Sequence, residues 1–316
     1  MWKERIDRAY LGIQSEIDLT PLEYSYPLSQ LSGANVYLKL ENYQVSGSFK
    51  IRGVLNKLHS LSPDQIEKGL VACSTGNHGA AFAHALKKLG HQGVLFLPTN
   101  TSKAKIEALE YYDVELWFHG NDCVITEGYS REYAKNKGKA LIHPYNDVDV
   151  LVGQGTIARE ILEQSTFNID AIIIPIGGGG LISGIATYFK EVNPDTEIIG
   201  TQPKNSAVMF ESIKHGHVVD DDERMTISDA TAGGIEKNSI TFELCRDMVD
   251  RYELINEADI RKGLKLLIEH HQMIVEGAAA LTVAALLKNS SRLEEKNVIL
   301  VLTGKRISNS LLKELF

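Results

Sequence analysis

Short hydrophobic runs alternate with helical patterns along most of this chain. A helical stretch at residues 80–90 repeats apolar side chains at the spacing of one helix face and ends on Gly90. The alternation predicts an α/β fold in which helices cover both faces of parallel sheets. Runs with the composition of strands cover residues 36–41, 69–74, 93–98, 114–118, 141–145, 171–177, 197–202 and 298–304.

Two of these runs, residues 171–176 and 298–302, are apolar at nearly every position, as expected of strands buried on both faces.

The pattern also suggests two domains. We expect a small mobile domain at residues 68–147 and a large domain that combines residues 1–67 with residues 148–316. Ligands in such folds bind at the carboxyl ends of strands, so the residues that follow each strand are the first candidates for a site.

Composition narrows the function classes. The chain has 316 residues, is 43% hydrophobic and carries a formal charge of −8, which argues against nucleic acid or anionic membranes as partners. It contains no apolar run of about 18 residues, and its start lacks the features of a signal peptide, so we expect a cytoplasmic protein. Its cysteines, Cys73, Cys123 and Cys245, are far apart and indicate neither a disulfide framework nor a zinc site.

The run at 171–176 is followed by "GGGGLISG", residues 177–184. Glycines let backbone amides approach an anion, and the start of the next helix adds partial positive charge. No register of the loop fits a dinucleotide fingerprint or a P-loop. The loop therefore indicates a site for a single phosphate, with a tight turn of no further function as the alternative.

A second unusual turn, "STGNHG" at residues 74–79, follows the run at 69–74. Ser74 or Thr75 could serve only to cap the next helix. That interpretation leaves Asn77 and His78 unexplained. The functional alternative is a cradle for a carboxylate, formed by hydroxyls and by amides at the helix start.

Lys50 lies in a small-residue turn, "SGSFKIRG" at residues 46–53. Alone, such a lysine is most often a solvated surface side chain. A phosphate loop, a carboxylate turn and a lysine together point to pyridoxal phosphate, which has one phosphate and forms a Schiff base with a lysine amine.

These motifs, with "VEGAAA" at residues 275–280, resemble the serine/threonine dehydratase branch of the fold-type II pyridoxal-phosphate enzymes in order and spacing. That branch includes threonine dehydratases, serine racemases and the hydroxyectoine-utilisation dehydratases, and the likeness runs from residue 20 to residue 304. The resemblance implies a two-domain fold similar to the tryptophan synthase β chain, pyridoxal 5'-phosphate as cofactor and a homodimer. We expect no separate regulatory domain.

The resemblance also assigns roles by position. Lys50 would form the Schiff base and later move the Cα proton. Around the cofactor ring, the resemblance implies that Phe49 packs near the ring, that Asn77 binds the ring hydroxyl and that Thr303 faces the pyridine nitrogen, while Gly234 and Glu276 line the cofactor's other edge. It implies that the phosphate is held by Gly177, Gly178, Gly179, Gly180 and Leu181. It also implies that the substrate carboxylate is bordered by Ser74, Thr75, Gly76, Asn77 and His78.

The implied activity is that of a lyase of amino acid catabolism, which converts L-threonine or L-serine to a 2-oxo acid and ammonia. A neutral hydroxyl at Thr303 would make the ring a weak electron sink and favour loss of a β-substituent. An apolar pocket beside Phe49 would keep Lys50 neutral. The run "SDATAGGIE" at 228–236 resembles the hydroxyectoine-utilisation branch, so a larger β-hydroxy amino acid remains a possible substrate. Racemisation stays open because Thr75 offers a hydroxyl on the opposite face. A non-catalytic binding protein and cysteine-synthase-type replacement rank lower.

Two departures from the family pattern stand out. Lys305 and Arg306 follow Gly304 where relatives carry small or amide residues, which puts the packing beside the pyridine ring in doubt. Gln202 and Val208 occupy positions where metal-activated relatives carry carboxylates, so no bound divalent cation is expected. The sequence leaves open the substrate side chain, the oligomeric state and any effector.

Overall fold

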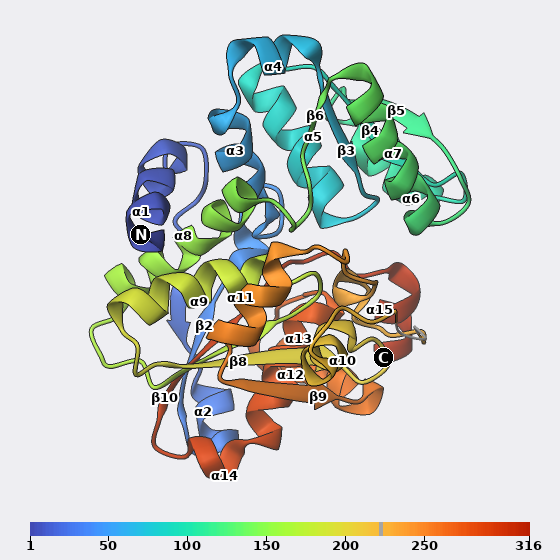
Figure 1. Cartoon of the computed structure of the whole chain (residues 1–316). Coiled ribbons are helices and arrows are strands. Elements are labelled where there is room, and N and C mark those ends of the chain that lie inside the picture. Colours follow the sequence, from blue (N-terminus) through green and yellow to red (C-terminus); the bar gives the residue numbers. More distant parts are fainter. Residues whose placement is uncertain (221–223) are drawn as a thin grey trace.

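Two β-sheets, each enclosed by helices, organise the chain (Figure 1). The structure, a computed structural model, describes residues 1–220 and 224–316. The larger sheet has the order β1-β2-β10-β7-β8-β9, with β1 Leu22–Tyr24, β2 Asn35–Lys39, β7 Ala171–Pro175, β8 Glu197–Pro203, β9 Arg251–Ile255 and β10 Asn297–Val301. The smaller sheet has the order β5-β4-β3-β6, with β3 Leu70–Cys73, β4 Gly93–Leu97, β5 Glu115–Phe118 and β6 Ala140–Leu141.

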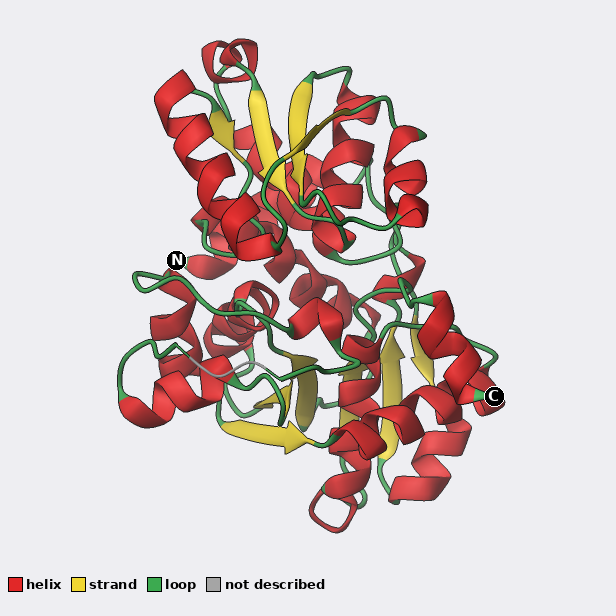
Figure 2. Ribbon diagram, turned by 90° about the vertical axis from the view of Figure 1, so that its right-hand side faces the viewer, coloured by secondary structure: helices red, strands yellow, loops and turns green. Residues whose placement is uncertain are grey.

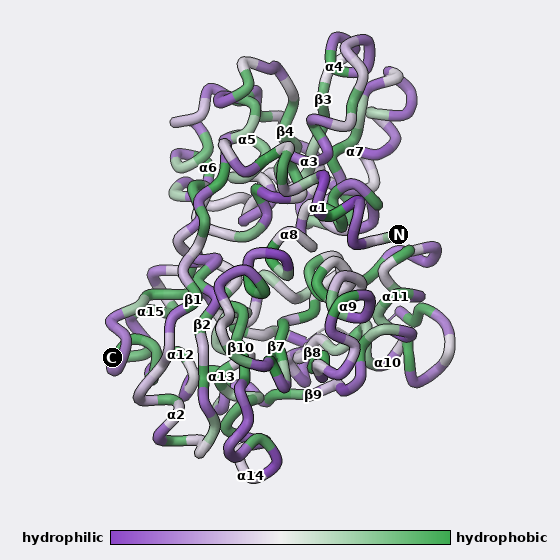
Figure 3. Tube along the Cα trace, turned by 90° about the vertical axis from the view of Figure 1, so that its left-hand side faces the viewer, coloured by the Kyte–Doolittle hydropathy of each residue, from purple (hydrophilic) through white to green (hydrophobic). Residues whose placement is uncertain are grey.

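The central strands of the larger sheet are apolar throughout because both of their faces are covered. Along β7, Ile172 and Ile174 join one core cluster while Ile173 joins the other. Figure 3 shows the resulting hydrophobic stretches on β7 and β10. One face is covered by α1 Trp2–Ile13, α8 Val148–Gln164, α9 Gly180–Val192, α10 Val208–His215 and α11 Ile240–Met248. The other is covered by α2 Tyr26–Ser32, α12 Glu257–His271, α13 Gly277–Lys288, α14 Ser290–Leu293 and α15 Asn309–Leu315.

The smaller sheet is enclosed in the same way (Figure 2). Its strands alternate between a cluster shared with α3, α5 and α6 and a cluster shared with α7. α3 contacts both α5 beside this sheet and α8 beside the larger one, so it ties the two sheets together. The remaining elements are η1 Glu41–Tyr43, α3 Lys50–Ser60, α4 Pro63–Lys68, α5 Asn77–Leu89, α6 Lys103–Glu110, α7 Cys123–Lys137 and η2 Asp229–Thr231.

Every predicted strand is present, and the predicted helix at 80–90 is the greater part of α5, which ends at Gly90 with φ of 68°. The α/β class with helix-covered parallel sheets is confirmed, except that β1 is antiparallel to β2. The predicted strand at 141–145 stops at Leu141. There, Nδ1 of His143 accepts hydrogen bonds from the amides of Tyr145 and Asn146, which turns the chain out of the sheet.

Two strands were not predicted, β1 and β9. β1 has only 3 residues, and β9 lies at the opposite edge of the sheet, where its side chains are only partly buried and the apolar signal is weak. Among the described helices, none combines the length and the apolar character needed to cross a bilayer.

Candidate active site

The turn that carries Lys50 is hydrogen-bonded to the loop after β10. Ser48 and Gly304 form an antiparallel bridge, and the amide of Phe49 donates to the Thr303 carbonyl at 3.1 Å. α3 begins at Lys50 itself. Two segments about 250 residues apart in sequence therefore meet at the carboxyl end of β10 and place Lys50 next to Thr303.

The amine of Lys50 lies between a backbone carbonyl and an aromatic ring. Its Nζ donates a 2.9 Å hydrogen bond to the carbonyl oxygen of Pro144 and lies 5.2 Å from the centre of the Phe49 ring. Burial lowers the pKa of Lys50 to about 8, although the carboxylates of Glu276 and Glu127 favour its charged form. About a tenth of this amine is therefore neutral and nucleophilic at pH 7, and the neutral fraction reaches one half near pH 8.

The glycine loop joins β7 to α9. Gly179 has φ of 85°, a backbone conformation that favours glycine. A Cβ atom on Gly178 would lie 2.4 Å from the ring of Tyr145, so a side chain is excluded there. Within the described residues, the amides of Gly177, Gly178 and Gly179 donate to no protein acceptor. Leu181 packs into the core, which leaves only its backbone for a ligand.

The turn at residues 74–79 opens α5. The helix begins at Asn77 with Gly76 as its N-cap, and the Ser74 hydroxyl accepts from the Gly76 amide at 3.1 Å. Neither Ser74 nor Thr75 caps the helix through its side chain. A Cβ atom on Gly79 would lie 2.2 Å from the Ser74 carbonyl oxygen, which explains the glycine that closes the motif. The Thr75 hydroxyl, the proton of the Ser74 hydroxyl and the first amides of α5 can therefore face an anion.

His78 is buried beneath this turn. Its Nε2 lies 2.8 Å from the carbonyl oxygen of Ile142, so this nitrogen carries the proton and donates. Burial lowers the pKa of His78 to about 3. His78 is neutral at physiological pH and positions the turn without adding a positive charge.

A buried carboxylate joins two predicted cofactor ligands. Glu276 Oε2 accepts from Asn77 Nδ2 at 2.6 Å, and Glu276 Oε1 accepts from the Thr303 hydroxyl at 2.7 Å. Burial raises the pKa of Glu276 to about 7. A Cβ atom on Gly304 would lie 2.7 Å from Glu276 Oε2, so glycine at this position makes room for the carboxylate.

These features fit the cofactor that the sequence implies. The site offers a partly neutral lysine amine, unused loop amides, and an Asn77 Oδ1 that is buried with no hydrogen-bond partner among the described residues. The contact of Gly234 with the cofactor stays a prediction. Gly234 is exposed, and no described atom lies within 4 Å of the position its Cβ would take.

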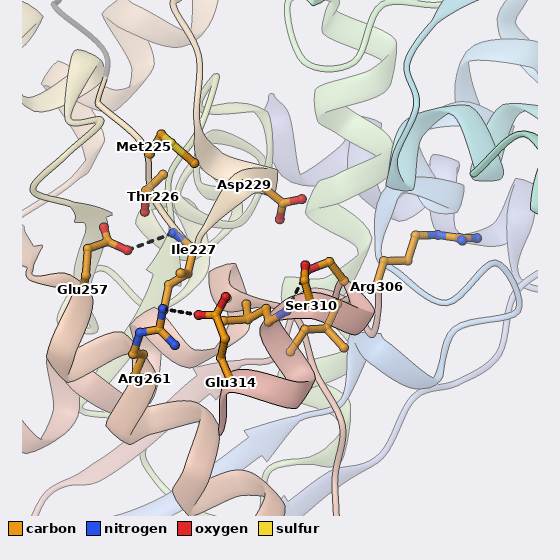
Figure 4. Close-up of a pocket in the computed structure, with 13 residues that line it drawn as sticks. Met225, Thr226, Ile227, Asp229, Glu257, Arg261, Arg306, Ser310 and Glu314 are labelled. Atoms are coloured by element: carbon orange, nitrogen blue, oxygen red, sulfur yellow. Dashed lines mark hydrogen bonds and ion pairs between the residues drawn. The ribbon is translucent and has the colours of Figure 1, made fainter. Parts of the chain in front are cut away.

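Lys305 and Arg306 point away from the Thr303 side chain. The stem of Lys305 covers Gly47, and Arg306 Nη2 lies 3.4 Å from the Ser46 carbonyl oxygen. Arg306 also lines a separate cavity of about 400 Å³ (Figure 4). The two cations therefore contact the lysine turn at Gly47 and Ser46.

Gln202 and Val208, where metal-activated relatives carry carboxylates, make contacts within the protein. The Gln202 side-chain oxygen accepts from the Phe210 amide at 2.9 Å, and Val208 is buried in the core. In the described part of the chain, no three His, Cys, Asp or Glu side chains come together as a metal site would require. The expectation that no divalent cation binds remains a prediction.

Sequence reasoning missed a cluster of side chains that connects the two sheets. Glu236 accepts hydrogen bonds from Asn146 and pairs with Arg131 of α7, and His143 Nε2 lies 3.2 Å from its Oε1. The Tyr145 hydroxyl accepts from the Glu236 amide at 3.0 Å. The sequence signal was weak, because His143 and Tyr145 lie within the predicted strand at 141–145 and only Asn146 follows it.

The sequence analysis also missed a buried network of charged side chains beneath the lysine turn. Arg52 donates to both oxygens of Glu41 and both oxygens of Glu160 at 2.7–2.8 Å, and Lys39 donates to Glu160 at 2.7 Å. All four side chains are fully buried. The network anchors the first turn of α3, and with it Lys50, to η1 and α8.

Comparison with known proteins gives consistent similarities. The profile of the family described as "Pyridoxal-phosphate dependent enzyme" matches residues 13–304. The chain is 39% identical over 306 residues to the catabolic L-threonine dehydratase of Staphylococcus aureus (strain USA300), covering 96% of this chain and 88% of that protein. It superposes on maize serine racemase with a TM-score of 0.92 at 30% identity, covering 99% and 95% of the two chains. For the processed threonine deaminase isoform 2 of Solanum lycopersicum, the TM-score is 0.91 at 30% identity, covering 99% and 92%.

Proposed function

This chain belongs to the pyridoxal-phosphate dependent enzymes, and from that premise we propose that it is an ammonia-lyase for a β-hydroxy amino acid. L-threonine or L-serine loses water and yields a 2-oxo acid and ammonia. One observation carries the proposal. Lys50 Nζ donates to Pro144, and the next residue, Tyr145, lies against Gly178, so the reactive amine and the phosphate loop share one wall.

The residues of the chain then take definite roles. When bound, pyridoxal phosphate supplies an electron sink for the electron pair left on Cα. Lys50 carries the cofactor and, as a neutral amine, takes the Cα proton. The amides of Gly177–Gly180 would bind the phosphate, Asn77 would bind the ring hydroxyl and Thr303 would lie at the ring nitrogen. Phe49, 8% exposed, keeps water from the amine.

The substrate carboxylate binds at the start of α5. Ser74, Thr75 and the amides of Asn77 and His78 form an anion site of the kind common at helix N-termini. Because His78 is neutral, the helix dipole and the hydroxyls supply the attraction. We propose that the unit at residues 68–147 closes over the substrate, since Arg131 of that unit already contacts Glu236 outside it.

A substrate panel tests the activity. Purified protein loaded with cofactor should release ammonia and 2-oxo acid in equal amounts from L-threonine, L-serine or a larger β-hydroxy amino acid. Lys50→Ala should lose this activity, whereas Lys88→Ala, an exposed lysine on α5, should retain it. No release from any of these substrates by loaded wild-type protein would refute the proposal.

Racemisation is the second candidate, favoured by the hydroxyl of Thr75 at the turn and by the similarity to maize serine racemase. It requires a proton donor on the face of Cα opposite Lys50. Chiral analysis of residual serine after partial turnover separates the two activities. Thr75→Val should then remove D-serine formation and spare part of the elimination.

We further propose that the protein acts in the cytoplasm as a homodimer, as the sequence predicts. Tyr24, Tyr26 and Leu31 expose large apolar surfaces near the β1 edge of the larger sheet and are available to a second copy. Sedimentation velocity should give twice the chain mass, and Tyr26→Glu should shift the population toward the monomer.

A further inference from the structure

One face of α7 is turned toward the residues beside the glycine loop. Arg131 lies on this face and pairs with Glu236, which also accepts a hydrogen bond from Asn146. Side chains four residues apart lie on the same face of a helix, so Glu127 stands one turn before Arg131 on this face. A different face of α7 is buried against the smaller sheet through Ala134. Glu127 therefore belongs to the side of α7 that faces Glu236 and its neighbours.

The charge of Glu127 is felt at all three parts of the candidate site. Burial lowers the pKa of Lys50 and raises the pKa values of Cys73 and Tyr145, and the Glu127 carboxylate acts on each of these groups as well. Cys73 ends β3 directly before the turn at residues 74–79, and Tyr145 lies against Gly178 of the glycine loop. Glu127 is therefore close to the lysine, to the carboxylate turn and to the wall of the phosphate loop.

The Glu127 carboxylate is left without a partner. Among the residues that the structure describes, none forms an ion pair or a side-chain hydrogen bond with it, and only its backbone carbonyl accepts, from the Ser130 hydroxyl at 2.8 Å. Burial raises the pKa of Glu127, and the charges of Arg131 and Lys50 offset this only in part. A half-buried carboxylate in this state carries a desolvation cost that a cation on a ligand offsets.

The proposed function leaves one part of the substrate unassigned. The substrate carboxylate is assigned to the turn at residues 74–79, and the α-amino group to the Lys50 end of the site. The group that extends beyond the β-carbon is the one left for Glu127. The methyl group of threonine would leave the carboxylate unpaired there, whereas an ammonium would pair with it.

We propose that Glu127 determines substrate specificity, and that the substrate is a β-hydroxy amino acid with an ammonium group on its γ-carbon or beyond. The inference rests on the proposed function and names the class of the larger β-hydroxy amino acid that the sequence leaves open. The Glu127 carboxylate accepts hydrogen bonds from that ammonium. No bond to Glu127 forms or breaks, so its effect is on which substrate is chosen and not on the elimination itself.

Two substrates that differ in a single group test the inference. 4-Amino-L-threonine carries an ammonium where L-3-hydroxynorvaline carries a methyl group. Protein loaded with cofactor should release 2-oxo acid from the amino compound with a kcat/KM roughly 10- to 100-fold higher, the range expected of a hydrogen bond to a charged group. Glu127→Gln should remove this preference. Glu132→Gln removes an exposed carboxylate from another face of α7 and should keep it.

A preference that Glu127→Gln leaves unchanged would overturn the inference, and so would a wild-type preference for the methyl compound. The second outcome needs no variant, so the inference stays testable if Glu127→Gln fails to fold. A merely structural Glu127 would lower both kcat/KM values together without changing their ratio.

Failure of the proposed function has a different signature. The loaded wild-type protein would then release 2-oxo acid from neither compound and from neither L-threonine nor L-serine. In that case the affinities of the two compounds, titrated against the absorbance of the bound cofactor, give the ratio instead. Equal affinities in wild type would overturn the role of Glu127.

Discussion

The amine nitrogen of Lys50 lies 2.9 Å from the carbonyl oxygen of Pro144. Lys50 begins α3, and Pro144 lies just beyond the last strand of the smaller sheet, so this hydrogen bond joins the two sheets at the reactive group. A carbonyl oxygen accepts from either form of the amine, and burial therefore decides which form predominates.

Cofactor attachment should follow the titration of Lys50. Only the neutral amine attacks an aldehyde, and burial lowers the pKa of Lys50 to about 8. The rate should rise with pH and reach half its maximum near pH 8. Stopped-flow absorbance after mixing cofactor-free protein with pyridoxal phosphate measures this. A half-point at the ordinary lysine value of 10.5 would contradict the burial argument.

Removing the charge of Arg52 should destabilise the whole protein. Arg52→Met leaves Glu41 and Glu160 buried with much of their pairing lost, and breaking such a pair costs about 3–5 kcal/mol. Arg52→Lys keeps the charge and should cost less. Urea unfolding measures the difference. Arg246→Met, at an exposed ion pair with Glu243, is the matched control and should leave the unfolding midpoint in place.

Gly178→Ala should weaken cofactor binding. The new Cβ would lie 2.4 Å from the ring of Tyr145, whose hydroxyl is held by the Glu236 amide. Overpacking of this kind costs about 1–3 kcal/mol, which corresponds to roughly 5- to 150-fold in affinity. Gly128→Ala in α7 meets no described atom within 4 Å and should leave affinity unchanged. Fluorescence titration compares the two, and equal affinities would show that the loop does not need glycine.

The contact between Arg131 and Glu236 should affect substrate binding more than turnover. It joins α7 to the loop before α11, so its loss should favour an open cleft. Because Arg131 is 39% exposed, we expect KM to rise only about two- to fivefold in Arg131→Met. A double-mutant cycle with Glu236→Gln tests the coupling. Strictly additive effects would mean that the two side chains act independently.

Much of the fold was readable from local pattern. Residues 171–176 are apolar throughout, and this alone predicted a central strand, because no other short element buries every side chain. β1 and β9 were not predicted, because edge strands need few apolar positions and so give only a weak strand pattern. The run at 141–145 was cut short by hydrogen bonds from its own backbone to His143, which no periodicity reveals.

The sequence predicted the individual motifs of the candidate site but not the contacts between them. Lys50, Asn77, Thr303 and the glycine loop each stand in a motif with its own physical rationale, and the structure brings Asn77 and Thr303 to the same carboxylate. Tyr145 and Pro144 carried no such signal, because their contribution is a ring face and a carbonyl oxygen. Those depend on where the backbone runs and not on residue type.

By itself, the sequence determined most of the strands, the glycine loop and a lysine in an unusual turn, because these depend on residues close together in the chain. Only the tertiary structure decided that Lys50 is partly neutral and that Glu276 stands behind Thr303. It also turned Lys305 and Arg306 away from the site. Burial and hydrogen-bond partners come from segments up to 250 residues apart, and a pKa or a proton position depends on all of them at once.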